Sequence, residues 1–174
     1  GWFQCLDRMW GRGGALSQLD ELLRPYYEAD LAAGRISGDE EVVWYFASLM
    51  FNDPHYSQIG GPTPDGSRDL TSPISFLILE ATHRLKIPSN LGVRVHDKLN
   101  PQLLHKAVQY LFEDGTGVCY PCSKGLDEGY ARNGVPIQLA RLSATVGCNW
   151  TALPGIEYPI QDCTRPCLTK PFLL

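Results

Sequence analysis

The chain has 174 residues, of which 44% are hydrophobic and 20% charged, and its formal net charge is −4. This composition is typical of a soluble globular protein with one sizeable core, and it argues against intrinsic disorder. The small acidic charge provides no basic surface for nucleic acid. No apolar stretch reaches the roughly 18 residues of a membrane span, and the N-terminus has no signal-peptide pattern. We therefore expect no nucleic-acid partner and no membrane. Because the chain opens without methionine and closes without a polar tail, we also expect a piece of a longer protein.

The cysteines leave two interpretations open. Cysteines occur at positions 5, 119, 122, 148, 163 and 167. The high apolar content disfavours a secreted disulfide framework, so reduced thiols in a cytoplasmic protein are the default expectation. The alternative is a structural metal-binding module without catalysis. In that interpretation Cys119, Cys122, Cys163 and Cys167 hold zinc or an iron–sulfur cluster. The 40 residues between the two pairs, and the absence of a glycine knuckle, argue against this alternative.

The first third of the chain is predicted to be helical. Apolar residues recur at helical spacing over 15–33, and Pro25 should kink or split that helix. Gly34 is a typical helix stop, and Ser37 with Glu40 forms a capping-box pattern that opens a second helix ending near residue 52. A glycine-rich passage over 58–66 follows, which is either a plain surface loop or a functional one.

The rest of the chain alternates between helical and strand-like patterns. Helix stops at glycine, proline and asparagine, together with changes of hydrophobic period, define the boundaries. The predicted helices cover 73–85, 101–114, 126–132 and 137–142, and the predicted strands cover 91–96, 117–122 and 143–146. Short apolar strands that alternate with helices indicate an α/β fold, either a barrel or a doubly wound sheet.

The predicted strand over 143–146 leads to a cysteine on a turn. Gly147 ends the strand, and Cys148 is followed by Asn149 and Trp150. A lone cysteine is often a small buried hydrophobe. The small residue before it also favours a second interpretation, in which the turn displays one sulfur into a cavity.

Several blocks of sequence resemble the glycyl radical enzymes, a family that includes pyruvate formate-lyase, diol and glycerol dehydratases and arylacetate decarboxylases. Each block is weakly specific alone, but they occur in the family's order and span about residues 2–162. The blocks are Q-I-G-G at 58–61 with P-D-G at 64–66, the helix 75–81, the strand 90–96 and V-G-C at 146–148.

The resemblance implies a fold and a radical chemistry. Residues 1–174 would form a single fragment of a ten-stranded α/β barrel, and the C-terminal glycyl radical domain would be absent because no R-V-x-G-Y-like motif occurs. Cys148 would be the thiyl residue that takes a hydrogen atom from a small organic substrate in anaerobic metabolism. A radical SAM activating enzyme would install the glycyl radical on another part of the protein, and this chain would bind no cofactor itself. The full-length protein would be a cytoplasmic homodimer, and the fragment alone would have no turnover.

The resemblance also assigns substrate-binding residues and narrows the reaction. Gly147 stands where pyruvate formate-lyase has a second cysteine, which argues against acyl transfer. Trp150 stands where many members carry a proton-transferring glutamate, and an indole cannot transfer that proton. The remaining reaction classes are a dehydratase-type lyase and a decarboxylase, and an aromatic pocket would favour the latter. The resemblance implies that Tyr158 and Asp162 bind the substrate, and we expect Asn149 and Trp150 to line its pocket because they stand beside the cysteine. Weaker candidates for proton transfer are Glu157, His96 and His105.

Overall fold

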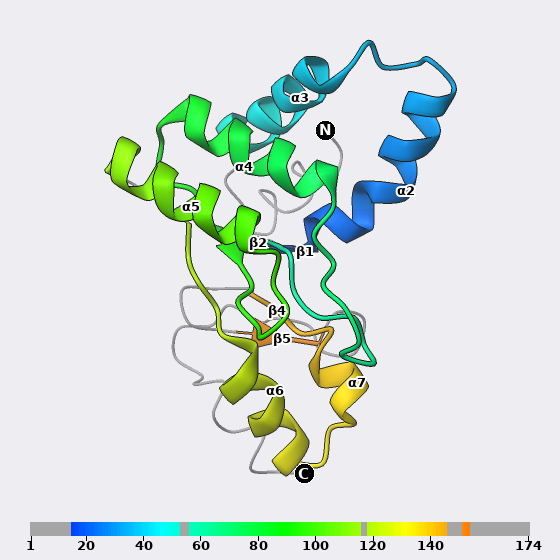
Figure 1. Cartoon of the computed structure of the whole chain (residues 1–174), viewed down its shortest axis with the longest axis vertical. Helices are drawn as coiled ribbons and strands as arrows, with labels where there is room; N and C mark the ends of the chain where they lie inside the picture. The colour runs from blue at the N-terminus through cyan, green and yellow to red at the C-terminus, as the bar shows by residue number, and fades with distance from the viewer. Residues whose placement is uncertain (1–14, 53–55, 116–117, 146–150, 154–174) are drawn as a thin grey trace.

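A parallel sheet forms the centre of the structure (Figure 1). The computed structural model describes residues 15–52, 56–115, 118–145 and 151–153. Strands β1 (Ala15–Gln18), β2 (Tyr56–Ile59) and β3 (Leu91–Val93) lie in the order β1-β2-β3, and both pairs are parallel. Residues 118–122 extend the sheet beyond β3 through parallel bridges from Gly92 to Cys119 and from Val95 to Cys122. The α/β class predicted from the sequence is therefore confirmed.

The helices lie in two groups along the molecule (Figure 1). Helices α2 (Leu19–Ala32), α3 (Asp39–Asn52), α4 (Pro73–Leu85) and α5 (Pro101–Asp114) form the upper group in this view. The lower group contains α6 (Ser123–Arg132), α7 (Ile137–Ala140) and the short strands β4 (Ala144–Thr145) and β5 (Thr151–Ala152). Among the described residues, no helix combines the length and the apolar character that crossing a bilayer requires.

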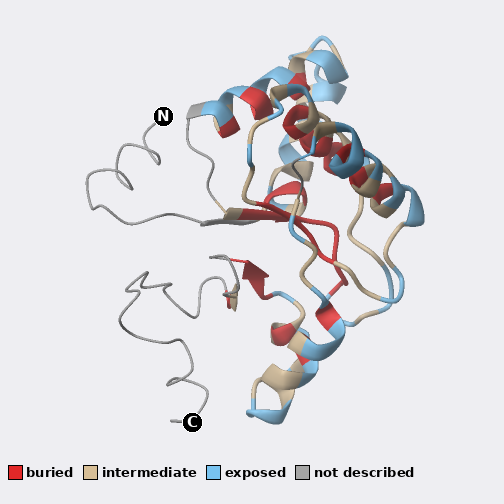
Figure 2. Ribbon diagram, turned by 90° about the vertical axis from the view of Figure 1, so that its left-hand side faces the viewer, coloured by how far each residue is buried: buried red, intermediate tan, exposed pale blue. Residues whose placement is uncertain are grey.

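The hydrophobic core lies between the sheet and the upper helices. Figure 2 shows buried residues along the strands and on the inner faces of the helices, and exposed residues on their outer faces. Burial of this apolar surface is the main favourable contribution to folding. The most deeply buried apolar side chains of the core include Ile59, Ile74, Ile78, Leu79, Leu91, Val93 and Leu103.

Local capping signals predicted several helix boundaries correctly. Ser72 precedes α4, Pro73 is its first residue, and the Ser75 hydroxyl oxygen accepts a hydrogen bond from the Ser72 N–H at 3.0 Å. The side chain of Asn100 caps α5 by accepting from the N–H of Gln102 at 2.9 Å. Gly34, Gly115 and Gly134 end three helices with φ values of 66°, 65° and 88°, a region that favours glycine.

The N-terminal predictions need three corrections. The predicted helix over 15–33 is wrong for its first four residues, because 15–18 pair with β2 as a strand. Helix α2 then continues through Pro25 without a split and gives up one intrahelical hydrogen bond there. The carboxylate that accepts from the Ser37 N–H, at 2.8 Å, belongs to Glu41 and not to Glu40. Helix α3 begins at Asp39, so Glu41 occupies its third position.

The strand and short-helix predictions also need correction. Residues 56–59, partly assigned to a loop, form strand β2. The strand predicted over 91–96 is limited to β3, and all its residues are buried, because both faces of this parallel sheet are covered. Helix α6 begins three residues earlier than predicted, at Ser123, and α7 ends at Ala140 instead of residue 142.

A single buried carboxylate joins three elements of the upper half. Asp20 at the start of α2 is fully buried, and its Oδ2 accepts from the Gly60 N–H at 2.8 Å and from the Ser75 hydroxyl at 2.6 Å. Its Oδ1 accepts from the Gln18 side chain and the Glu21 N–H, both at 2.8 Å. Burial raises the pKa of Asp20, whereas these four donors favour its charged form. The carboxylate thereby fixes the end of β2 against the starts of α2 and α4.

Replacing Asp20 by alanine should lower the free energy of unfolding by about 3 kcal/mol, because the Gly60 amide and the Ser75 hydroxyl would lose a buried acceptor. Urea unfolding followed by circular dichroism measures the change. The matched control is Asp30→Ala, whose carboxylate pairs with Arg35 on the exposed surface and should contribute little. Equal losses in the two variants would contradict the structural role of Asp20.

Candidate active site

Strands β4 and β5, which come before and after the predicted cysteine turn in the sequence, form an antiparallel pair. Ala144 pairs with Ala152 and Thr145 with Thr151, so residues 146–150 connect the two strands. The predicted lead-in strand is therefore confirmed at 144–145. The five predicted site residues lie outside the described residues and stay predictions; they are Cys148, Asn149, Trp150, Tyr158 and Asp162. Glu157 also lies outside them.

A buried glutamine connects the parallel sheet to β4. Gln58 in β2 is 1% exposed, and its Nε2 donates to Gln18 Oε1 at 2.6 Å and to the carbonyl oxygen of Ser143 at 3.4 Å. The Thr145 hydroxyl donates to Gln58 Oε1 at 3.4 Å. Strands β1 and β2 and the entry to β4 are thus joined through one side chain.

A buried arginine holds the same carbonyl. Arg94, directly after β3, is 1% exposed, and its Nη1 donates to the carbonyl oxygen of Ser143. Its Nε donates to the Ser123 hydroxyl at 2.6 Å, and its Nη2 pairs with Asp127 and donates to the Ala140 carbonyl oxygen at 3.4 Å. The Ser143 carbonyl oxygen therefore accepts from both Arg94 and Gln58, five residues before Cys148.

Burial shifts both members of the ion pair towards their neutral forms. It lowers the pKa of Arg94, and the nearby Asp127 carboxylate opposes that shift. Burial raises the pKa of Asp127, and the Arg94 charge opposes that shift. The paired, charged state is the stable one because each partner would otherwise be a buried charge without compensation. Gly61, at φ +111°, leaves room for this arginine, since a Cβ there would lie 3.1 Å from Arg94 Cδ.

A second polar pair lies beside the glycine-rich loop. His96 Nε2 lies 2.7 Å from Asp69 Oδ1, and Asp69 also accepts from the Asn100 N–H at 3.0 Å and the Gly61 N–H at 3.3 Å. Burial disfavours the charge of Asp69, yet the hydrogen bonds from His96 and its other donors hold its pKa below the usual range. The structure thus gives His96 a carboxylate partner, whereas His105 lies exposed on α5.

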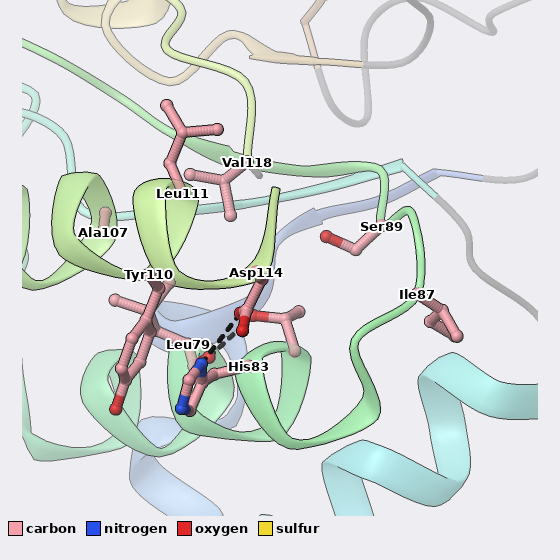
Figure 3. Close-up of a pocket in the computed structure, with 10 residues that line it drawn as sticks. Leu79, His83, Ile87, Ser89, Ala107, Tyr110, Leu111, Asp114 and Val118 are labelled. Atoms are coloured by element: carbon pink, nitrogen blue, oxygen red, sulfur yellow. Dashed lines mark hydrogen bonds and ion pairs between the residues drawn. The ribbon is translucent and has the colours of Figure 1, made fainter. Parts of the chain in front are cut away.

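A small cavity between α4 and α5 has a histidine beside it but does not suit an organic substrate. Figure 3 shows His83 and Asp114 pointing toward each other, with Nδ1 and Oδ2 separated by 2.8 Å. The ring of His83 stacks on Tyr110 at a centroid distance of 3.7 Å. The cavity has a volume of about 20 Å³, which is space for one water molecule. It also lies in the upper helical group, away from β4 and β5 (Figure 1).

The geometry of Cys119 and Cys122 is unfavourable for the alternative metal site. Both thiols are free and exposed. The backbone around them is paired with β3 and the residues that follow it. The Cys119 N–H donates to the Leu91 carbonyl, and the Val95 N–H donates to the Pro121 carbonyl, both at 2.8 Å. Residues three apart in an extended strand point to opposite faces, whereas one metal ion needs both thiolates on the same side. Cys163 and Cys167 lie outside the described residues.

Four residues of this buried network were missed in the sequence: Gln58, Arg94, Asp127 and Ser143. The one local signal was the charge of Arg94 inside the apolar run Leu91-Gly-Val-Arg-Val. A charged residue in such a strand needs a buried partner.

The sequence matches the family model described as pyruvate formate lyase-like over residues 5–174. The chain belongs to the pyruvate formate lyase-like family. Its sequence is 28% identical over 141 residues to the isethionate sulfite-lyase of Nitratidesulfovibrio vulgaris, an alignment that covers 67% of this chain and 17% of that protein.

Solved structures of glycyl radical enzymes share the fold. A glycyl radical enzyme from Archaeoglobus fulgidus superposes with a TM-score of 0.75 at 20% identity, over 82% of this chain and 21% of that one. The structure reported for 1,2-propanediol dehydration in Roseburia inulinivorans gives a TM-score of 0.69 at 23% identity, over 81% and 20%. The chain therefore spans about a fifth of the length of these proteins and resembles part of their barrel domain. A closed ten-stranded barrel stays a prediction.

Replacing Arg94 by methionine should lower the free energy of unfolding by about 3–5 kcal/mol, because Asp127 would be left as a buried carboxylate without its cation. The double variant Arg94→Met/Asp127→Leu removes both charges and should recover a large part of this loss. Chemical denaturation of the three proteins measures the difference. If the double variant is as unstable as the single one, the account of the buried pair is wrong.

Proposed function

We propose that this chain is the part of a glycyl radical lyase that carries the hydrogen-abstracting cysteine, Cys148. The observation that supports this most strongly is the antiparallel β4–β5 pair, whose five-residue connection contains Cys148. The residue before its first strand, Ser143, is held at its carbonyl oxygen by Arg94 and Gln58. Membership of the pyruvate formate lyase-like family gives that hairpin its chemical context.

In the proposed reaction, Cys148 would move a hydrogen atom rather than act as a nucleophile. A glycyl radical outside these residues would supply the oxidising equivalent, by taking the hydrogen atom of the thiol. The resulting thiyl would take a hydrogen atom from a small organic substrate and return it at the end of the cycle. Such transfer requires a neutral, desolvated thiol, in contrast to the thiolate of nucleophilic cysteines. The buried residues at the base of the hairpin, Ala144, Ala152 and Leu153, are consistent with a desolvated position.

The reaction class that we favour is a dehydratase or related elimination. The names of similar proteins support it: an isethionate sulfite-lyase, an enzyme of 1,2-propanediol dehydration, and the hydroxyproline dehydratase of Clostridioides difficile. A decarboxylase remains the second type within the proposal. Because Trp150 cannot transfer a proton, another residue would supply that function. We propose that Asn149, Trp150, Tyr158 and Asp162 contact the substrate.

The rest of the proposal concerns the whole protein. A radical SAM activating enzyme would be its partner, and the full-length protein would be an anaerobic, cytoplasmic homodimer. The chain alone would have no turnover, since the proposed radical glycine lies elsewhere. Turnover by these 174 residues alone would contradict that part.

Replacing Cys148 by serine in the anaerobically activated full-length protein should abolish turnover, because an alcohol O–H is a far poorer hydrogen-atom donor than a thiol. The glycyl radical signal in electron paramagnetic resonance should remain. The matched control is Cys119→Ser, which makes the same atomic change at an exposed thiol of the sheet edge and should leave turnover unchanged.

Two results would overturn the proposal. One is full turnover in Cys148→Ser. The other is a full-length sequence that lacks the loop carrying the radical glycine. The metal-binding alternative has its own readout. Stoichiometric zinc or iron that is lost when Cys119, Cys122, Cys163 and Cys167 are replaced would favour a structural metal module over a radical enzyme.

A further inference from the structure

A cleft of about 220 Å³ opens beside the buried Arg94–Asp127 pair. Its walls come from the loops that follow β2 and β3, from the first turns of α6, and from α7 with the residue after it. Strands β2 and β3 and the 118–122 segment run parallel, so their carboxyl ends meet at this edge of the sheet. Open parallel sheets place ligand sites at this edge. The volume suits a small molecule of a few non-hydrogen atoms.

Three cations from three different elements line the cleft. Lys98 follows β3, Lys124 is in the first turn of α6, and Arg141 follows α7. Within the described part of the chain, none of the three forms an ion pair. Lys98 Nζ donates to the carbonyl oxygens of Gly66 and Ser67, both at 2.9 Å, and Arg141 Nη1 donates to that of Pro64 at 3.0 Å. These contacts with neutral carbonyl oxygens fix the positions of two cations without neutralising their charges.

The carboxylates of the cleft do not cancel this positive charge. Asp127 pairs with the buried Arg94, and Glu128 pairs with Arg132 at 3.2 Å. Asp97 is the third carboxylate that lines the cleft, and it lies exposed at the surface. Lys98, Lys124 and Arg141 therefore face Asp97, and Asp127, which is already paired with Arg94, interacts at longer range with Arg141.

A histidine nitrogen adds a polar group to the same wall. The His96 side chain is 9% exposed, and Nε2 is engaged by Asp69 at 2.7 Å. Its Nδ1 has no hydrogen-bond partner within the part of the chain that the structure describes. The carboxylate fixes the orientation of the ring by accepting from Nε2–H, so Nδ1 of the neutral imidazole is an acceptor that suits a ligand hydroxyl.

We infer that this cleft binds a small organic anion through Lys98, Lys124 and Arg141, with His96 Nδ1 available to a hydroxyl group of the same ligand. The ligand group that fits is an oxyanion of the carboxylate, sulfonate or phosphate type. The planar guanidinium of Arg141 and the ammonium groups of the two lysines both bind such oxygens. The start of α6 also favours an anion. Its N-cap residue, Cys122, makes no side-chain capping bond, so no side chain of that residue occupies the first backbone N–H groups of the helix. This site is independent of the proposed radical chemistry, because it needs neither Cys148 nor a radical.

The test is a calorimetric titration of the purified protein, without radical activation, with acetate, methanesulfonate and inorganic phosphate in separate arms. At least one of the three should bind saturably. Lys124→Gln should weaken that binding about tenfold through loss of one charge-assisted contact. Asp97→Asn should strengthen it, because it removes the opposing carboxylate. The matched control is Lys86→Gln, an exposed lysine at the end of α4, outside the cleft, and it should leave affinity unchanged.

Two outcomes would overturn the inference: no saturable binding of any of the three anions, or equal weakening by Lys124→Gln and Lys86→Gln, which would indicate non-specific attraction. Lys124 is exposed and has no ion pair among the described residues, so its variant should keep the fold, and circular dichroism checks this. The three arms decide which anion class is preferred. Loss of turnover in Cys148→Ser has no bearing on the titration, so the two proposals fail separately.

Discussion

The buried guanidinium of Arg94 links the parallel sheet to α6, to α7 and to the residue that precedes β4. A charge at 1% exposure is tolerated only when an opposite charge and hydrogen-bond acceptors surround it. Arg94 finds the carboxylate of Asp127 in α6 and the carbonyl oxygens of Ala140 and Ser143 on either side of the link from α7 to β4. One side chain therefore sets the positions of two helices and one strand relative to β3. Gly61 leaves space for this side chain, because a Cβ at position 61 would lie 3.1 Å from Arg94 Cδ.

The same hydrogen bonds hold the backbone that leads into the candidate site. The Ser143 carbonyl oxygen accepts from Arg94 and Gln58, and Gln58 is joined in turn to Gln18 in β1. Gln18 also donates to Asp20, which accepts from the Gly60 N–H and from Ser75 in α4 and so extends the network. Hydrogen-atom transfer acts over short distances, so a catalytic cysteine needs a rigidly held support. A continuous buried network from α4 to the entry of the β4–β5 pair provides such a support for the proposed function.

The sequence predicted those parts of the fold that local signals determine. Proline and asparagine at the starts of α4 and α5, and glycine at the end of α5, act within one turn of the helix, so these boundaries were found. Strand β1 was assigned to a helix because it forms only through pairing with β2, about 40 residues away. The burial of Arg94 was missed because its partner Asp127 is 33 positions away. His96 was a weak candidate for the same reason, since its partner Asp69 is 27 positions away.

The central claim is that Arg94 holds the β4–β5 pair in place, and hydrogen–deuterium exchange of Arg94→Lys tests it most directly. Lysine keeps the positive charge beside Asp127 but lacks the planar fork that also reaches the Ser143 carbonyl. The account predicts faster exchange over residues 143–153, while helix α4 keeps its protection. Unchanged exchange over 143–153, or an equal loss of protection in α4, would contradict it.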